Sequence, residues 1–324
     1  MHFGSMFKVQ TATLGGILVD TNAITWNARL LDYVTPSQQA VFITTDPRWT
    51  NVTLRMLLSM SSGICDEAVT GDFYATLYTF NTDPAAGRRY LLDVLLHHPL
   101  DAAPGTTYFY SNIGYAFAGL MLEVAWRQFS GETITYEQLI QQKLFDPLGI
   151  TTASHGVPGI SATIPTNLPA PNPSPVAIGH NAATNVPVDG LPLGAPVGLG
   201  YVDADNPLSV IPAGAWAMSI DDYIRLLVVQ MQTNQSTLLD SLGLRIETLN
   251  DIRTPVTSIP SEPFSFSLGW AVDNADSNHF VYTGSNERWI SKVDMRLGTQ
   301  VGLVAACNQG ACGDALQDAV AVLA

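Results

Sequence analysis

The first residues of the chain include a serine and a lysine whose spacing would let the lysine activate the serine. Ser5 and Lys8 stand three positions apart in the opening stretch MHFGSMFK, and residues with this spacing share one face of a helix. A lysine amine beside a serine hydroxyl can activate that hydroxyl as a nucleophile. A Ser-x-x-Lys pair alone is a common coincidence, so its meaning depends on what else the sequence supplies.

Two later segments can complete such a site. Tyr110 and Asn112 stand at a predicted turn that leads into a helix expected over residues 113–128. A tyrosine held beside a lysine can have its proton affinity lowered, and it can then pass a proton to a leaving group. The run Tyr282-Thr283-Gly284-Ser285 ends a predicted strand, where the glycine lets a substrate backbone approach an edge strand closely.

The composition bounds the class of protein. With 324 residues, of which 47% are hydrophobic and 13% charged, the chain is long enough for one large domain or two of ordinary size. No apolar run approaches the roughly 18 residues of a membrane span, and no signal peptide is present, so we expect a soluble protein. A net charge of −14 argues against nucleic acid as a partner, because phosphate contacts need clustered lysine and arginine.

Arginine and cysteine offer few further sites. Arg88-Arg89 is the only adjacent basic pair, and we interpret it as a solvated helix face rather than a phosphate site. No Cys-x-x-Cys or His-x-x-x-His spacing indicates a metal, and no cofactor is expected. Cys307 and Cys312 are near enough in sequence to bridge, but we interpret them as free small residues in a packed region.

Hydrophobic periodicity predicts a helix-rich first part and a sheet-rich last part, which is an α+β arrangement. The stretch 158–212 holds 11 of the 20 prolines, so we predict an extended loop there that covers a pocket. Helices are expected over 5–19, 51–60, 85–98, 113–128, from 219 onward and over 313–324, and strands over 264–272, 280–282, 290–295 and 301–307.

Together and in this order, the three motifs resemble the serine β-lactamase and penicillin-binding-protein superfamily, and most closely its class C β-lactamases, DD-peptidases and related esterases. The resemblance runs over essentially the whole chain, with support from residues 52–63, 146–150, 212–216 and 268–270 and from Asn308. It implies a β-lactamase-like fold, in which an antiparallel sheet flanked by helices adjoins a mainly helical domain. The expected domains are residues 1–20 with 213–324, and residues 21–212.

The resemblance also implies a role for each residue of the first two motifs. Ser5 would be the nucleophile that forms an acyl-enzyme, and Lys8 would be the base that activates it. Tyr110 would carry the proton to the leaving group, while Asn112 would orient Lys8 and the substrate. A lysine in this role must be largely neutral, so we expect burial to lower its pKa. Which group takes the first proton is left open between Lys8 and Tyr110.

The third motif matches the substrate side of the family's site. The backbone N–H groups of Ser5 and Ser285 would form the oxyanion hole, and Tyr282, Thr283 and Gly284 would bind substrate. The family usually has lysine or histidine where this chain has Tyr282. A neutral phenol can donate one hydrogen bond but cannot replace a charge that meets a substrate carboxylate. This departure favours neutral esters or amides over penicillin-type substrates.

A second departure concerns the start of the chain. The family places a helix and two strands before its Ser-x-x-Lys helix, whereas four residues precede Ser5 here. A sheet without those strands presents an unpaired edge. The expectations are a start codon set too late, a natural truncation, a partner chain or swapped element that fills the gap, or an inactive relic.

Four functional hypotheses remain after the sequence has been read. The first is a serine hydrolase that acts through an acyl-enzyme on small ester or amide substrates. The alternatives are a β-lactamase or D-Ala carboxypeptidase/transpeptidase, an acyltransferase of the same fold, and a non-catalytic truncated homologue. The oligomeric state and the compartment are left open.

Overall fold

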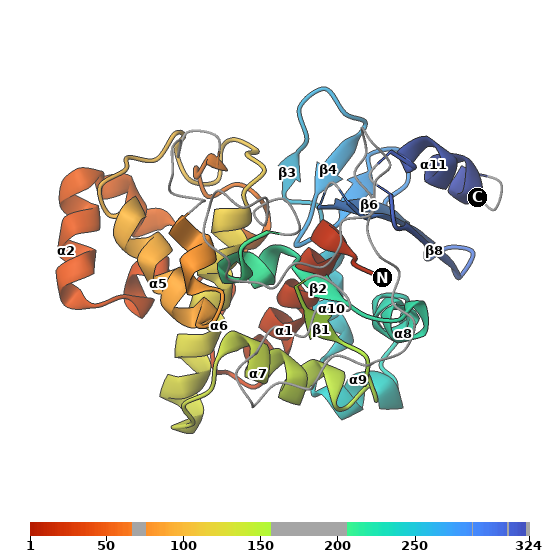
Figure 1. Cartoon of the computed structure of the whole chain (residues 1–324), viewed down its shortest axis with the longest axis horizontal. Helices are drawn as coiled ribbons and strands as arrows, with labels where there is room; N and C mark the ends of the chain where they lie inside the picture. The colour runs from red at the N-terminus through yellow and green to blue at the C-terminus, as the bar shows by residue number, and fades with distance from the viewer. Residues whose placement is uncertain (67–75, 157–205, 287, 310, 322–324) are drawn as a thin grey trace.

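The computed structural model describes residues 1–66, 76–156, 206–286, 288–309 and 311–321 (Figure 1). Most of the predicted Pro-rich cover, at 157–205, lies outside these residues. The α-helices are α1 (Lys8–Asp20), α2 (Pro36–Thr45), α3 (Leu54–Leu58), α5 (Pro84–Leu95), α6 (Asn112–Ser130), α7 (Tyr136–Ile140), α8 (Ile220–Gln230), α9 (Thr237–Leu242), α10 (Ile246–Arg253) and α11 (Gly313–Ala321). Shorter helical turns are η1 (Gly4–Phe7), η2 (Leu30–Tyr33), η3 (Pro47–Asn51), η5 (Tyr78–Phe80), η6 (Gln141–Phe145) and η8 (Leu208–Ala213).

The strands form an antiparallel sheet, as the sequence predicted. In the described residues its order is β3-β4-β5-β6-β7-β8, with a separate pair β1-β2. The bounds are β1 (Ser154–His155), β2 (Trp216–Ala217), β3 (Thr257–Ser258), β4 (Phe264–Phe266), β5 (Ala271–Asp273), β6 (His279–Ser285), β7 (Ile290–Arg296) and β8 (Val301–Cys307). β8 is an edge strand, and no described strand pairs with its outer side.

Helices cover the sheet on both faces. α11 packs on β7 and β8 on one side, while η1 contacts β6 and β7 from the other. In Figure 1 the sheet and α11 lie apart from α2 and α5, with the N-terminal segment and α1 between them. The α+β architecture with a helical region next to an antiparallel sheet is therefore confirmed.

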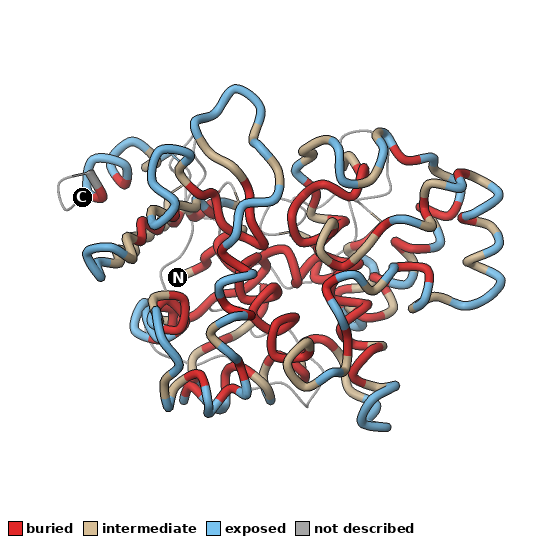
Figure 2. The backbone as a smooth tube through the Cα atoms, turned by 180° about the vertical axis from the view of Figure 1, so that it is seen from behind, coloured by how far each residue is buried: buried red, intermediate tan, exposed pale blue. Residues whose placement is uncertain are grey.

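α1 runs through the centre of the molecule. Every residue from Lys8 to Leu18 is buried, and Figure 2 shows buried backbone gathered in the centre near the N-terminus. A helix that is buried on all sides has no solvent face to keep charges exposed. Lys8 is thus placed in the core by the helix that carries it.

The predicted helix over 5–19 begins differently in the structure. Residues Gly4–Phe7 form the single 3₁₀ turn η1, and the α-helix starts only at Lys8. Gly4 has φ +51°, and a Cβ at this position would lie 2.6 Å from Ser285 N. The left-handed backbone at Gly4 lets the chain enter α1 while η1 lies directly against β6.

The predicted strand over 264–272 is wrong, because the structure divides it into β4 and β5. The two strands form a hairpin that turns at Gly269, which has φ +101°. A Cβ on Gly269 would lie 2.6 Å from the Cα of Val9 in α1. The chain therefore turns where glycine lets the hairpin approach α1.

The described end of the Pro-rich stretch is not an extended loop. Residues Leu208–Ala213 form the 3₁₀ turn η8, and all six of them are buried. η8 packs between α5 and α6 and reaches α1. The apolar side chains of Leu208, Val210 and Ile211 account for this difference, because their burial outweighs the preference of Pro212 for extended backbone.

The prediction of two free cysteines is wrong as well, since Cys307 and Cys312 are joined by a disulfide. Cys307 ends β8, and the turn that follows includes a hydrogen bond from Cys312 N to Gln309 O. This turn brings the two Cα atoms to 6.6 Å, which is within the range that a disulfide can span. Cys65 is the free cysteine among the described residues.

The interpretation of Arg88-Arg89 as a solvated helix face holds for only one of the two. The side chain of Arg89 is 53% exposed, whereas that of Arg88 is fully buried. Arg88 Nη1 donates to Glu137 Oε1 at 2.7 Å, and its Nη2 donates to Glu123 Oε2 at 3.3 Å. Two buried carboxylates thus compensate a charge that periodicity alone assigned to solvent.

None of the described helices combines the length and the apolar composition needed to cross a membrane.

The close contact between η1 and β6 predicts a large penalty for a small substitution. A Cβ on Gly284 would lie 1.9 Å from Phe3 O and 2.9 Å from Met6 N, so the Gly284→Ala variant must separate η1 from β6. We expect it to lower the free energy of unfolding by about 1–3 kcal/mol, as overpacking does elsewhere. Denaturant titration measures the change.

Gly298→Ala is the matched control, because no atom lies within 4 Å of a Cβ built there. It should change stability by less than about 0.5 kcal/mol. Equal unfolding midpoints for the two variants would contradict the packing described here.

Candidate active site

The side chains of the first two predicted motifs meet at one point. Lys8 Nζ lies 3.0 Å from Ser5 Oγ, 2.8 Å from the Tyr110 hydroxyl and 2.8 Å from Asn112 Oδ1. The hydroxyls of Ser5 and Tyr110 also share a short hydrogen bond. Tyr110 and Asn112 come from the start of α6, more than 100 residues after Ser5, so tertiary folding assembles this group.

The amine of Lys8 has a fourth neighbour that the sequence did not suggest. Its Nζ donates to the carbonyl oxygen of Ala213 at 2.9 Å, at the end of η8. No side-chain motif marks this contact, because the acceptor is backbone. Asn112 Oδ1 and Ala213 O can only accept hydrogen bonds. They take two N–H groups of the amine, and the lone pair of a neutral amine is then left facing the hydroxyls of Ser5 and Tyr110.

Burial lowers the pKa of Lys8 below its ordinary value of 10.5. The side chain is fully buried, and desolvation is the largest cause of the shift. The charge and hydrogen bond of Tyr110 and the charge of Asp66 act in the opposite direction. The direction of the shift is the one that a base for Ser5 requires, and it agrees with the expectation from the sequence.

Tyr110 is the solvent-exposed member of this group. Its side chain is 42% exposed, whereas Lys8 is fully buried and Ser5 is partly buried. The hydroxyl contacts both Ser5 Oγ and Lys8 Nζ. A proton can therefore pass between the buried amine and a molecule that approaches from outside by way of a single phenol.

Asp66 supports this arrangement and was missed in the sequence. One carboxylate oxygen accepts from Ser111 Oγ at 2.6 Å and from Ile113 N at 3.3 Å, and the other accepts from Asn112 N at 2.7 Å. Ser111 in turn caps α6 by accepting from Gly114 N. The carboxylate thus fixes the turn that carries Tyr110 and Asn112. It stands 45 residues before Ser111 in the chain, so local pattern offers no signal for it.

Burial raises the pKa of Asp66, while hydrogen bonds from Ser111, Asn112 and Ile113 and the charge of Lys8 act to lower it. Three donors converge on the carboxyl oxygens, and the ionised form accepts them best. Asp66 therefore acts on Lys8 in two ways. It holds two of the groups that contact the amine, and its negative charge raises the pKa of that amine.

The third motif lies against the start of the chain. The backbone of Ser285 is adjacent to that of Gly4, one residue before Ser5, and Ser291 Oγ donates to Phe3 O at 2.8 Å across the same contact. This brings Ser5 and Ser285 to the same place, as an oxyanion hole needs. Their role as its two donors stays a prediction.

Tyr282 and Thr283 occupy opposite faces of β6. The hydroxyl of Tyr282 is buried close to Tyr110, and burial raises the pKa of Tyr282 well above its ordinary value of 10. Tyr282 is therefore neutral. Thr283 is exposed and pairs with Lys292 of β7. Direct substrate binding by Tyr282, Thr283 and Gly284 stays a prediction.

The match to known families agrees with this geometry. The model of the family described as Beta-lactamase matches residues 1–324. The chain belongs to the β-lactamase family. Members of this family are serine hydrolases, and the motif resemblance seen in the sequence is thereby confirmed. A search of curated proteins found no match to the chain.

Solved structures of the same fold match over nearly all of this chain. An octameric penicillin-binding protein homologue from Pyrococcus abyssi has a TM-score of 0.70 at 19% identity, covering 99% of this chain and 65% of its own. A penicillin binding protein from Bacillus halodurans has a TM-score of 0.69 at 18% identity, covering 100% and 86%. A D-stereospecific amidohydrolase from Streptomyces sp. has a TM-score of 0.68 at 20% identity, covering 96% and 82%.

The TM-scores show a common fold. The present chain spans just under two thirds of the length of the Pyrococcus abyssi protein.

Replacing Lys8 separates its contribution to reactivity from its contribution to stability. We expect Lys8→Met to slow acylation of Ser5 by about 10²–10⁴-fold, because the base is removed. The fold should remain as stable or become more stable, since an apolar side chain avoids the cost of burying the amine. Labelling with a fluorophosphonate probe and thermal unfolding measure the two effects, and a variant that unfolds would contradict this account.

The lowered pKa of Lys8 should also appear in how the labelling rate and the stability of the native protein depend on pH. Because burial lowers the pKa of Lys8, the labelling rate should rise with pH and level off below pH 10.5. The unfolded chain binds more protons between the lowered pKa and 10.5, so the native protein should gain stability relative to Lys8→Met as pH rises through that range. If the stability of the native protein relative to Lys8→Met fell with rising pH, the pKa of Lys8 would not be lowered.

Asp66→Asn tests the support of Tyr110 and Asn112. We expect a loss of about ten- to hundredfold in the labelling rate, because the turn that carries both residues loses an acceptor. Removal of the negative charge should also move the rising limb of the pH–rate profile to lower pH, since Asp66 raises the pKa of Lys8. Asp93→Asn is the control, because within the described part of the chain this exposed residue accepts a hydrogen bond from Gln38 and has no contact with the Lys8 group. If the pH–rate profile of Asp66→Asn did not shift, Asp66 would only cap the turn and would not affect the pKa of Lys8.

Proposed function

We propose that this protein is a serine hydrolase that cleaves small, neutral esters or amides through an acyl-enzyme. The observation that carries the proposal is the position of Lys8 Nζ, fully buried and within 3.0 Å of Ser5 Oγ, with the Tyr110 hydroxyl 2.8 Å away. A buried amine next to an accessible serine and a partly exposed phenol can move protons both to and from a reacting carbonyl.

Acylation begins when Ser5 Oγ attacks the carbonyl carbon of the substrate. The Ser5 proton passes to Lys8 Nζ, either directly or through the Tyr110 hydroxyl, since both groups contact Ser5 Oγ. The C–O or C–N bond of the substrate then breaks, and the same pair returns the proton to the departing alcohol or amine. The N–H groups of Ser5 and Ser285 stabilise the negative oxygen of the tetrahedral intermediate.

Deacylation uses the same groups in reverse order. A water molecule attacks the ester carbonyl of the acyl-enzyme, and its proton passes to Tyr110 or Lys8. The bond to Ser5 Oγ breaks, Ser5 recovers its proton and a carboxylic acid is released. Asn112 and Ala213 keep two N–H groups of Lys8 engaged throughout, so the remaining position of the amine, a lone pair when neutral and an N–H when protonated, faces the reacting oxygen.

The substrate class follows from the charges around the site. Tyr282 stands where relatives have lysine or histidine, and its buried hydroxyl is neutral. The chain as a whole carries −14 and repels anions at long range. A substrate without a carboxylate near the scissile bond suits these surroundings best.

A second candidate function is the hydrolysis of β-lactams or D-Ala peptides, which carry a carboxylate. Lys292 favours it, because β7 aligns this lysine directly across from Thr283, and cross-strand partners share one face of a sheet. Under this alternative, Lys292 would supply the charge that Tyr282 lacks.

A nitrophenyl ester and a chromogenic cephalosporin tested side by side distinguish the two candidates. We expect turnover of the ester, little turnover of the cephalosporin, and no change of either in Lys292→Met. Intact-mass analysis should find the acyl group on the native protein and none on Ser5→Ala. Cephalosporin turnover that falls in Lys292→Met would favour the second candidate instead.

The remaining alternatives give different outcomes in the same assay. Labelling that survives Ser5→Ala contradicts Ser5 as the nucleophile. An acyl-enzyme that accumulates in water and is released faster by an added alcohol or amine indicates an acyltransferase. A folded protein that reacts with neither the ester nor a fluorophosphonate is a non-catalytic homologue.

A further inference from the structure

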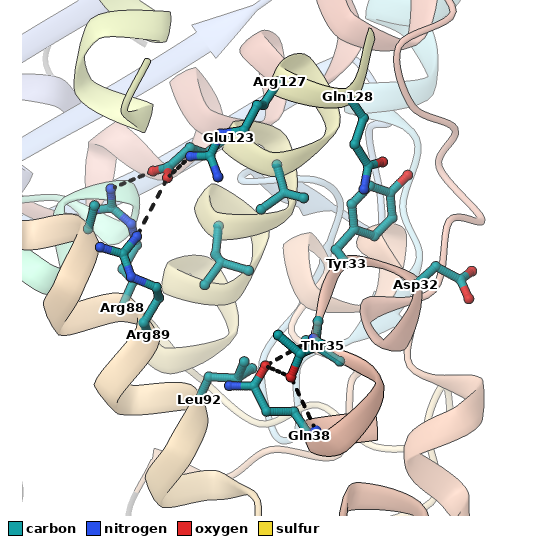
Figure 3. A pocket seen from close by; sticks show the side chains of 14 residues that line it. Asp32, Tyr33, Thr35, Gln38, Arg88, Arg89, Leu92, Glu123, Arg127 and Gln128 are labelled. Atoms are coloured by element: carbon teal, nitrogen blue, oxygen red, sulfur yellow. Dashed lines mark hydrogen bonds and ion pairs between the residues drawn. The ribbon is translucent and has the colours of Figure 1, made fainter. Parts of the chain in front are cut away.

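A second cavity lies on the helical side of the molecule, and the Arg88-Arg89 pair lies on its wall. Figure 3 shows this cavity between α5, α6 and the segment that leads into α2. Its volume is about 330 Å³, at the lower end of the range of small-molecule sites. Glu123 is 11 residues after Asn112 on α6, so the cavity is about 16 Å along that helix from the catalytic group.

One wall of the cavity is basic. Arg88, Arg89 and Arg127 surround the buried carboxylate of Glu123, at 3.3, 3.9 and 3.1 Å respectively. Among the described residues, Glu137 pairs with Arg88, and Asp32, the other carboxylate that lines the cavity, pairs with Arg29. Arg88, Arg89 and Arg127 set against Glu123 and Glu137 then leave one positive charge uncompensated. This occurs in a chain with a net charge of −14, where just 14 residues are basic.

Several polar groups around the cavity have unused hydrogen-bonding capacity. Arg89 is 53% exposed, and its one ion pair, to Glu123, is long at 3.9 Å. The Nε atom of Arg127 is buried without an acceptor. Figure 3 shows Tyr33 and Gln128 on the side of the cavity away from Arg88 and Arg89. Hydrogen-bond donors thus stand on both sides of the opening.

The floor of the cavity is apolar. It is formed by Ala85 and Leu92 of α5 and by Leu120 and Val124 of α6. The first three of these side chains are buried, so the floor is a continuation of the core. A ligand that fills the cavity must therefore pair an apolar body with a polar end near the arginines.

We propose that this cavity binds a small monocarboxylate with an apolar body. The carboxylate would bridge Arg89 and Arg127, because a guanidinium pairs with two oxygens in one plane. One uncompensated positive charge matches a single negative charge. The neighbouring Glu123 would repel the second charge of a phosphate or phosphonate dianion. The apolar body would lie over Leu92 and Leu120.

Titration calorimetry with 4-phenylbutyrate tests the proposal. We expect the native protein to bind this carboxylate at least about tenfold more tightly than the neutral 4-phenylbutyramide and more tightly than benzylphosphonate. Arg89→Gln should weaken the carboxylate about tenfold and leave the amide unchanged. This variant keeps the buried pairs of Arg88 intact, because Arg89 makes only the long contact to Glu123.

Arg225→Gln is the matched control. Arg225 is exposed to 55% and pairs with Asp222 within its own helix, away from the cavity, so binding should not change. Protein whose Ser5 carries a fluorophosphonate should bind the carboxylate as tightly as free protein, which separates this cavity from the catalytic group. The proposal is overturned if the amide binds equally well, if Arg89→Gln has no effect, if blocking Ser5 abolishes binding, or if no carboxylate binds at millimolar concentration.

Discussion

The arrangement of Ser5, Tyr110 and Asn112 depends on the buried amine of Lys8, which contacts all three. A lysine side chain in a protein core is costly unless its N–H groups find acceptors and its charge is given up. Here the acceptors come from two distant segments, the side chain of Asn112 at the start of α6 and the carbonyl of Ala213 at the end of η8. Because both accept only, they orient the remaining lone pair toward Ser5 and Tyr110. In the proposed hydrolase, the same contacts that make burial tolerable would therefore set the direction of proton transfer.

Close backbone packing holds the partners of Lys8 in place. Gly4 and Gly284 let η1 and β6 approach to a distance that a methyl group would prevent, which fixes Ser5 beside Ser285. On the other side, Asp66 accepts from the first residues of α6 and holds Tyr110 and Asn112 toward the amine. Both constraints limit how far the reacting groups can move from one another, which is how a rigid scaffold contributes to catalysis.

Much of the fold follows from local pattern, and the misses have identifiable causes. The prediction of a helix over 113–128 is close to α6, because a long apolar period needs no tertiary information. α2 was missed, although Thr35 and Gln38 form a capping box that announces it. The strand predicted over 264–272 is two strands, because the chain turns at Gly269 where it packs against α1. Arg88 is buried because two glutamates distant in sequence pair with its charge. In each of these last two cases a long-range contact overrode a short-range preference.

By itself, the sequence determined which reactive side chains exist, in what order they occur and which family they resemble. Ser5, Lys8, Tyr110 and Asn112 could be named from their types and spacing. Tertiary structure alone decided that the amine is buried, that Ala213 and Asp66 belong to the site, and that the hydroxyl of Tyr282 is buried close to Tyr110. The physical reason is that proton affinity depends on desolvation and on neighbouring charges. Those are set by packing between segments that lie tens to hundreds of residues apart, and no local motif encodes them.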